Sequence, residues 1–126
     1  MKKKILVIDD DATIRFLLQN LLHDYDVVAI GDGYEALDWL NAGNIPDLIM
    51  LDMEMPNING RVLIRRIKFT QQFRKIPIII ISGTESNSIK TTFLKLGAFD
   101  YVVKPFTEAL LFNKVNSALA LATPSI

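Results

Sequence analysis

The stretch Ile5-Leu6-Val7-Ile8-Asp9-Asp10-Asp11 decides the fold, because four apolar residues run directly into three carboxylates. Short apolar runs bounded by turn residues predict strands that are buried on both faces. Three more such runs end in polar residues: Leu48–Leu51 in Asp52, Ile78–Ile81 in Ser82 and Gly83, and Tyr101–Val103 in Lys104 and Pro105. Because the carboxyl ends of parallel strands open into one crevice, we expect these carboxylates, the hydroxyl and the ammonium group to converge.

Helical patterns alternate with the apolar runs five times, which predicts an α/β fold of the (βα)5 doubly wound type, with helices on both faces of a parallel sheet. The predicted strands are Ile5–Ile8, Asp26–Ile30, Asp47–Leu51, Ile76–Ile81 and Phe99–Val103. The first predicted helix carries Ile14, Leu17, Leu18, Leu21 and Leu22 at helical spacing, and the later ones are Tyr34–Leu40, Gly60–Phe69, Ser86–Leu96 and a helix from Thr107 to about Ala122. Asp10 or Asp11 is the predicted N-cap of the first helix, and Gly43 and Gly97 are predicted helix ends.

The size and composition of the chain limit what it does. Its 126 residues fit one domain, residues 1–126, with no output domain. The formal net charge is zero, which argues against direct nucleic-acid binding. The absence of cysteine and of any apolar run near the ~20 residues that span a bilayer predicts a cytoplasmic protein without membrane insertion. The basic residues between Arg61 and Lys75 are interpreted as a solvated face rather than a docking patch.

Asp9, Asp10 and Asp52 are the candidate metal ligands. Three carboxylates at neighbouring strand ends repel one another and raise one another's pKa unless a cation compensates. Oxygen-only ligands select a hard ion, and Mg²⁺ takes one or two carboxylates while leaving positions for phosphate oxygens. The sequence therefore predicts a Mg²⁺ site, whereas Asp11 alone is explained by helix capping.

Ser82, Gly83 and Lys104 supply what a phosphoryl group needs beside those acids. Phosphoryl transfer spreads negative charge over the equatorial oxygens, so catalysis is mostly positioning and cationic neutralisation. Lys104 offers an ammonium group, Ser82 a hydroxyl, and the small Gly83 lets a phosphate approach the backbone. Together these residues predict phosphoryl chemistry at the end of the sheet.

Over nearly its whole length the chain resembles the receiver domains of two-component response regulators. The motifs that carry the resemblance are Ile5–Asp11, Leu51–Gly60 (Leu-Asp-Met-Glu-Met-Pro-Asn-Ile-Asn-Gly), Ile80–Gly83 and Asp100–Phe106. The resemblance implies a five-stranded sheet in the flavodoxin-like order 2-1-3-4-5. It also implies a phosphorylation-dependent signalling switch of a phosphorelay, and not a conventional enzyme.

The resemblance also implies roles for the acidic residues. Asp52 would accept a phosphoryl group from the phosphohistidine of a sensor histidine kinase or phosphotransfer protein, forming an acyl phosphate whose hydrolysis resets the switch. Asp10 and Asp52 would bind Mg²⁺ directly, Asp9 mainly through water, and the backbone carbonyl of Glu54 would add a ligand. The side chain of Glu54 lies at a position that tunes dephosphorylation in this family, and we hypothesise that its charge alters the access of water.

Three further residues receive roles from the resemblance. Lys104 corresponds to the conserved lysine, and Ser82 to the switch hydroxyl that follows the phosphoryl group. Ser82 stands where threonine is frequent and lacks the methyl that restricts its rotamer. Tyr101 corresponds to the aromatic that rotates inward when that hydroxyl moves. The alternative for Tyr101 is an aromatic half-buried at the sheet edge with its hydroxyl in water.

Two other functions remain open at this point. Asp9-Asp10-Asp11-Ala12-Thr13 also fits the Asp-x-Asp-x-Thr pattern of haloacid-dehalogenase-type phosphatases, with Asp9 as nucleophile and Asp11 as general acid. Against it, no acidic pair follows Lys104 and Asp52 would have no role. The second alternative is an interaction module that keeps the receiver shape without being phosphorylated.

The last predicted helix carries few charges. Glu108 and Lys114 are the only charged residues from Thr107 onward, and Leu110, Phe112 and Leu121 add apolar groups beyond its inner stripe. Such a helix predicts a covered second face. The resemblance implies a homodimer or an output surface through the last strand and the last two helices, and the alternative is a modest exposed apolar patch.

Overall fold

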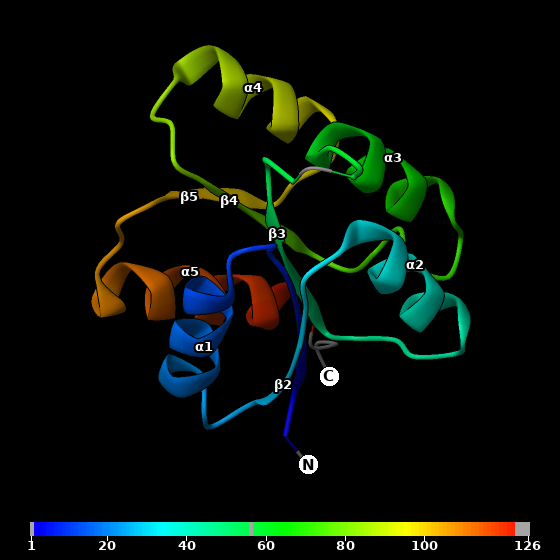
Figure 1. Cartoon of the computed structure of the whole chain (residues 1–126), viewed down its shortest axis with the longest axis horizontal. Coiled ribbons are helices and arrows are strands. Elements are labelled where there is room, and N and C mark those ends of the chain that lie inside the picture. The colour runs from blue at the N-terminus through cyan, green and yellow to red at the C-terminus, as the bar shows by residue number, and fades with distance from the viewer. Residues whose placement is uncertain (1, 56, 123–126) are drawn as a thin grey trace.

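The computed structural model describes residues 2–55 and 57–122, without the side chains of 121 and 122. Its core is one parallel sheet whose strands follow the order β2-β1-β3-β4-β5 (Figure 1). The strands are β1 (Lys4–Ile8), β2 (Asp26–Ile30), β3 (Leu48–Asp52), β4 (Ile78–Ser82) and β5 (Asp100–Val103). The predicted fold class and strand order are confirmed.

Helices cover both faces of the sheet (Figure 1). On one face lie α1 (Ala12–Leu21) and α5 (Glu108–Ala122), and on the other α2 (Gly33–Asn41), α3 (Gly60–Phe69) and α4 (Asn87–Lys95). Across residues 2–55 and 57–122, none of the helices combines the length and apolar character that a bilayer crossing requires.

Short polar side chains begin the helices, and glycines end two of them. Asp11 is the N-cap of α1, which decides between the two aspartates that the sequence left open; its side chain accepts from the Thr13 N–H. Gly43 and Gly97 follow α2 and α4 with φ of 103° and 110°. Only glycine adopts this left-handed region without strain, so both predicted helix ends are confirmed.

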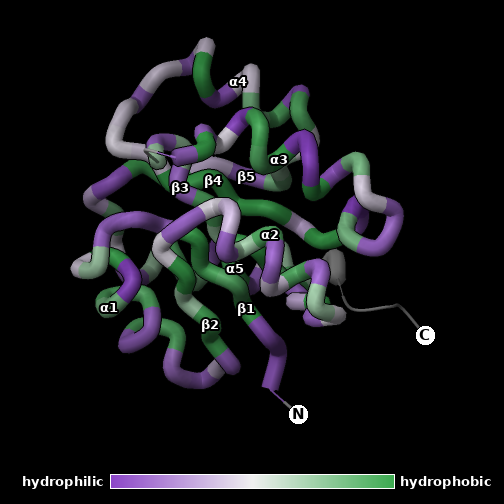
Figure 2. The backbone as a smooth tube through the Cα atoms, turned by 45° about the vertical axis from the view of Figure 1, so that its right-hand side comes forward, coloured by the Kyte–Doolittle hydropathy of each residue, from purple (hydrophilic) through white to green (hydrophobic). Residues whose placement is uncertain are grey.

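The continuous apolar runs divide between two cores because successive strand residues point to opposite faces. In β1, Leu6 and Ile8 pack under α2, α3 and α4, whereas Ile5 and Val7 pack under α1 and α5. Figure 2 shows the central strands as the hydrophobic part of the backbone, with hydrophilic segments around them. A sheet covered on both faces needs such runs, so polar residues are confined to the strand ends.

Two strands extend one residue further than the apolar pattern predicted, and this extension places the site. Asp52 is the last residue of β3 and is aligned with Ile81, and Ser82 is the last residue of β4 and is aligned with Val103. β4 begins at Ile78 because Ile76 still belongs to the preceding turn, where its N–H donates to the Phe73 carbonyl. The sheet itself therefore fixes the backbone of Asp52 and Ser82.

Candidate functional site

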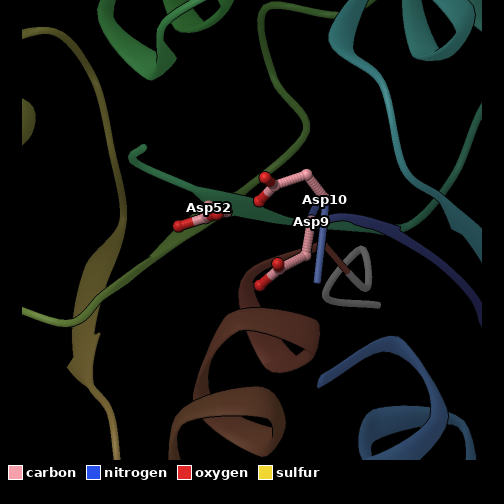
Figure 3. Close-up of side chains that lie close together, drawn as sticks. All are labelled: Asp9, Asp10 and Asp52. Carbon is pink, nitrogen blue, oxygen red and sulfur yellow. The ribbon is translucent and has the colours of Figure 1, made fainter. Parts of the chain in front are cut away.

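Three carboxylates meet at the carboxyl edge of the sheet (Figure 3). Asp9 and Asp10 directly follow β1, and Asp52 ends the neighbouring β3, where Leu51 is aligned with Ile8. One carboxylate oxygen from each of the three lies within 4.8 Å of the others. Asp9 is fully buried, Asp52 is 5% exposed and Asp10 faces solvent, so the cluster is a buried pair with an open third side.

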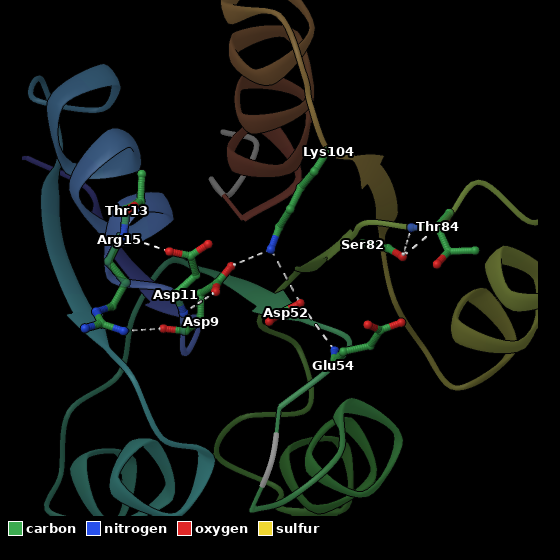
Figure 4. A network of polar contacts seen from close by, with 9 residues as sticks. All are labelled: Asp9, Asp11, Thr13, Arg15, Asp52, Glu54, Ser82, Thr84 and Lys104. Carbon is green, nitrogen blue, oxygen red and sulfur yellow. Dashed lines mark hydrogen bonds and ion pairs between the residues drawn. The ribbon is translucent and has the colours of Figure 1, made fainter.

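Lys104 reaches from the end of β5 to both buried carboxylates (Figure 4). Its ammonium nitrogen lies 3.1 Å from Oδ2 of Asp9 and 3.8 Å from Oδ1 of Asp52. Its backbone N–H donates to the Ser82 carbonyl at 2.7 Å, which anchors the residue to β4. The predicted convergence of the acids with Lys104 is thus present in the structure.

One ammonium group does not balance two buried carboxylates. Burial raises the pKa of Asp52 to about 7, and the charge of Asp9 adds to this effect. The Lys104 ammonium and the Glu54 N–H, which donates to Oδ1 at 3.3 Å, act in the opposite direction. A further cation would therefore be needed to keep Asp52 ionised at neutral pH.

The donor set fits Mg²⁺. Oδ1 of Asp9 accepts from the Asp11 N–H at 2.9 Å, whereas the buried Oδ2 has no hydrogen bond of good geometry even though Lys104 is near. A buried carboxylate oxygen without a hydrogen bond is costly unless a cation compensates it. Asp9, Asp10 and Asp52 present only oxygen, the ligand that hard cations prefer. The sole histidine, His23, is exposed beyond the end of α1 and plays no part in this cluster.

Ser82 and Tyr101 both donate to one backbone carbonyl. Ser82 is buried, with 1% of the residue exposed. Its hydroxyl points toward Thr84 (Figure 4) and donates to the Thr84 carbonyl at 3.2 Å. The Tyr101 hydroxyl donates to the same oxygen at 2.6 Å. Tyr101 is only 7% exposed, so the alternative of a half-buried ring with its hydroxyl in water is wrong.

Gly83 and Glu54 lie at the open side of the site. Both are exposed, and a Cβ added to Gly83 would meet no atom within 4 Å. The space beside Gly83 is therefore free for a ligand, although packing alone does not demand a glycine there. The Glu54 backbone contacts Asp52 through its N–H.

Two contacts at the site were not foreseen from the sequence. Nη1 of Arg15, on α1, donates to the Asp9 backbone carbonyl at 2.8 Å (Figure 4). A Cβ on Gly31 would lie 2.7 Å from that same Nη1, so the arginine fills the space between β1 and the turn after β2. The other contact involves the Thr84 carbonyl, a backbone atom whose role cannot be predicted from the residue type. For Arg15, the sequence showed only a basic residue in the first helix after the acidic run.

Comparison with known proteins assigns this arrangement to a family. Residues 5–116 match the sequence profile described as the response regulator receiver domain. The chemotaxis protein CheY1 of Helicobacter pylori is 34% identical over 119 residues, which cover 92% of this chain and 96% of that protein. A probable transcriptional regulator, ycf27 of Porphyridium aerugineum, is 38% identical over 120 residues, and there the chain spans about half of the relative's length, 48%.

Solved structures agree with the sequence relatives. A putative response regulator from Chloroflexus aurantiacus superposes with a TM-score of 0.90 at 30% identity, covering 95% of this chain and 99% of that one. The receiver domain of a signal transduction histidine kinase from Syntrophus aciditrophicus superposes with a TM-score of 0.86 at 30% identity, covering 98% and 96%. Both the fold and the sequence thus point to the same family.

The raised pKa of Asp52 predicts a pH-dependent stability difference for Asp52→Asn. Without metal, the native wild type keeps Asp52 protonated up to about pH 7, whereas the unfolded chain releases the proton near its ordinary pKa of 3.8. The stabilisation by that proton is complete below pH 3.8 and is lost as the pH rises through 7. In urea unfolding with EDTA, we expect the free energy of unfolding of Asp52→Asn, relative to that of the wild type, to increase by about 1–2 kcal/mol between pH 5 and pH 8. A difference that stays constant with pH would contradict this.

Arg15→Ala is expected to weaken Mg²⁺ binding although Arg15 is not a ligand. The guanidinium fixes the Asp9 carbonyl, and its loss frees the backbone that aims Asp9 and Asp10. Groups that orient ligands typically contribute several-fold to metal affinity, and we expect the Mg²⁺ dissociation constant from calorimetry to rise about threefold to tenfold. Arg61→Ala, an exposed arginine on α3, is the matched control. Equal dissociation constants for both variants would refute the positioning role.

Proposed function

The chain belongs to the response regulator receiver family, and we propose that Asp52 is its phosphoacceptor, receiving a phosphoryl group from the phosphohistidine of a sensor histidine kinase or a phosphotransfer protein. Receiver domains belong to two-component signalling systems and are not conventional enzymes. The observation that carries the proposal is the meeting of the buried Asp52 carboxylate with Lys104 and two further carboxylates at one open edge of the sheet.

In the proposed transfer, a carboxylate oxygen of Asp52 attacks the phosphorus, a P–O bond forms and the P–N bond to the imidazole breaks. The freed imidazole nitrogen takes up a proton. Lys104 neutralises the negative charge on the equatorial oxygens, which its place 3.8 Å from Asp52 allows. Mg²⁺, when bound, supplies the second positive charge at the same oxygens, and Asp9, Asp10, Asp52 and the Glu54 carbonyl would hold it.

Hydrolysis returns the site to its starting state. Water attacks the phosphorus of the acyl phosphate, inorganic phosphate leaves and the Asp52 carboxylate is restored. Glu54 is exposed and its backbone N–H donates to Asp52, so the residue lies beside the proposed phosphoacceptor. We propose that its negative charge influences the lifetime of the phosphorylated state.

Competition for the Thr84 carbonyl supports a relay from Asp52 to Tyr101. The Ser82 hydroxyl and the Tyr101 hydroxyl donate to this oxygen at 3.2 and 2.6 Å. A phosphoryl group on Asp52 offers Ser82 a charged acceptor, which is a stronger partner than a carbonyl. When Ser82 turns to it, Tyr101 becomes the sole side-chain donor to Thr84, and the segment after β4 is held against β5.

The signal would leave the domain beside Tyr101. A hollow of about 490 Å³ between α4, β5 and α5 is lined by Tyr101, Lys104 and Leu110, among others, and Leu110 is 40% exposed. Phe112 is half-buried, and the side chain of Leu121 lies outside the described residues. We propose this face as the surface on which a partner or a second copy docks, in the cytoplasm, where phosphohistidine donors of this kind act.

Of the two alternative functions, the structure favours neither. The Asp11 side chain is the N-cap of α1 and accepts from the Thr13 N–H at 2.8 Å, so it is not free to act as the general acid of a phosphatase. The phosphorylation-independent interaction module predicts that Asp52 does not react, which the following experiment decides.

Phosphorylation of Asp52 is tested by intact-mass analysis after incubation with acetyl phosphate and Mg²⁺. We expect one added phosphoryl group on the wild type and none on Asp52→Asn, because only Asp52 combines burial with contact to Lys104. Asp9→Asn should still react, more slowly. Turnover of phosphate by Asp52→Asn but not by Asp9→Asn would establish the phosphatase, and an unreactive wild type would establish the interaction module.

Tyr101→Phe separates the relay from the chemistry. The substitution keeps the buried ring and removes the hydroxyl that donates to Thr84. We expect phosphorylation by acetyl phosphate within about twofold of wild type, because the ring lies outside the reacting groups. The phosphorylation-induced shifts of the amide NMR signals of residues 83–86 should fall by at least about half, since one net hydrogen bond to Thr84 is lost. Unchanged shifts would refute the relay.

A further inference from the structure

Charge is distributed very unevenly along this neutral chain. Residues 1–56 carry eleven acidic and four basic residues, whereas residues 57–98 carry eight basic residues and one acidic residue. The helices α2 and α3 are neighbours on the same face of the sheet (Figure 1) and carry exposed charges of opposite sign. The exposed charges of α2 are Glu35 and Asp38, and those of α3 are Arg61, Arg65 and Arg66. Among the described residues none of these five side chains forms an ion pair, so the two stripes of opposite sign are unpartnered.

Apolar side chains lie exposed between and beside the two stripes. Phe69, at the end of α3, is 88% exposed, and Tyr34 and Val62 are 47% and 39% exposed. A hollow of about 490 Å³ separates the helices, lined from α2 by Leu37 and Asn41 and from α3 by residues that include Phe69. Aromatic and arginine side chains around a hollow are the composition of a protein–protein interface. We define the exposed surface of α2 and α3 as the α2–α3 face.

The alternation of sign decides which partner fits the α2–α3 face. A uniformly acidic surface such as nucleic acid, an anionic membrane or an acidic peptide would meet repulsion from Glu35 and Asp38, and a basic surface would be repelled by α3. The fitting partner carries the same two stripes side by side in reversed order. A second copy of this chain does so when it is turned about a two-fold axis that runs along the hollow, because each α2 then faces the other copy's α3.

We propose that the α2–α3 face binds a second copy of the chain through this two-fold arrangement. A two-fold axis across the helices would instead place α2 on α2 and α3 on α3, where like charges meet, so only the axis along the hollow is favourable. Because each contact occurs twice, the interface is closed and does not extend into a filament. The proposal gives Arg65 and Arg66 a contact, where the sequence pattern alone indicated a solvated face.

The order of residues along the two helices supports this pairing. Both helices start at the carboxyl edge of the parallel sheet and have nearly equal lengths, nine residues for α2 and ten for α3. Asp38 and Arg65 are each the sixth residue of their helix, and Glu35 and Arg61 are the third and second. The last residue of α3, Phe69, then lies level with Asn41 at the end of the hollow. Acids thus meet bases at two levels, and the most exposed aromatic side chain lies over the hollow of the other copy.

This association is separate from the switch described above. Among residues 2–55 and 57–122, the hollow between α2 and α3 shares no lining residue with the hollow beside Tyr101, and no hydrogen bond or ion pair joins the exposed charges of α2 and α3 to Asp52. Two short helices per copy make a small interface, for which we expect a dissociation constant of roughly 100 µM. The dimer should therefore form in the unphosphorylated protein and weaken as salt screens its charges.

Sedimentation equilibrium from 10 µM to 1 mM protein tests the proposal, in about 50 mM salt and without a phosphoryl donor. We expect a monomer–dimer equilibrium whose dissociation constant rises at least about tenfold in Phe69→Asp and in Arg65→Glu. Phe16→Asp, the same kind of change at an exposed phenylalanine on α1, on the opposite face of the sheet, is the matched control and should stay within about twofold. All these positions are exposed, so circular dichroism should show folded variants.

A charge exchange makes the test specific for the two-fold pairing. Arg65→Glu and Asp38→Arg should each fail to self-associate, because each homodimer places like charges opposite one another twice. Their equimolar mixture should recover association, since both contacts of the mixed dimer then join opposite charges. Monomeric wild type at 1 mM, a dimer weakened by Phe16→Asp but not by Phe69→Asp, or no recovery in the mixture would each overturn the proposal. A monomer that binds anionic vesicles or a poly-glutamate peptide would overturn it in favour of another partner.

Discussion

The structure depends on the burial of Asp9 and Asp52 side by side at the carboxyl edge of the sheet. Two adjacent parallel strands bring them there, because Ile8, which precedes Asp9, is aligned with Leu51, which precedes Asp52, and both carboxylates are buried. Lys104 compensates part of their repulsion from a third strand, at 3.1 and 3.8 Å. Removing the lysine would leave two buried carboxylates without a cation, which is more costly than the ion pairs are favourable. The site therefore constrains where β1, β3 and β5 end.

Incomplete compensation is what suits the site to its proposed chemistry. The pKa of Asp52 is raised to about 7, mainly by burial, so without a metal ion this proposed nucleophile is partly protonated at neutral pH. The buried Oδ2 of Asp9 likewise has no well-formed hydrogen bond. Both features are unfavourable in the free domain, and both would be relieved by a divalent cation on the same oxygens. The free energy that burial costs at this edge would thus be recovered when the proposed metal ion and phosphoryl group bind.

The sequence predicted the fold and the convergence of the site because both rest on patterns of residue type. Continuous apolar runs ending in Asp52, Ser82 and Lys104 indicated buried strands whose ends meet, and the structure brings these residues together as expected. The strand order came from the family resemblance, since periodicity does not say which strands are neighbours. Some observed strand ends differ from the predicted ones by one or two residues. At the carboxyl ends of β3 and β4, the hydrogen-bonded ladder continues through a polar residue because the next strand is aligned with it.

What the sequence could not predict depends on backbone atoms and on rotamers. The Thr84 carbonyl accepts from both Ser82 and Tyr101, and a carbonyl carries no residue-type signal. The hydrogen bond from Arg15 to the Asp9 carbonyl could not be predicted for the same reason, because its acceptor is a backbone atom. A tyrosine in a strand can have a buried or a half-exposed ring. Tyr101 is buried, and its hydroxyl has a backbone acceptor whose position the sequence does not show.

The division of the sheet into two helix layers explains how switching and self-association can be independent. Ser82 and Tyr101 belong to β4 and β5, and Lys104 directly follows β5, so the proposed relay from Asp52 would run on that side of the sheet. The buried sides of α2 and α3 pack against the sheet through apolar residues such as Ala36 and Leu63. A close-packed apolar layer transmits a displacement only where its parts have two arrangements. A constitutive contact on this face would therefore leave the surface beside Tyr101 free to respond to phosphorylation in each copy.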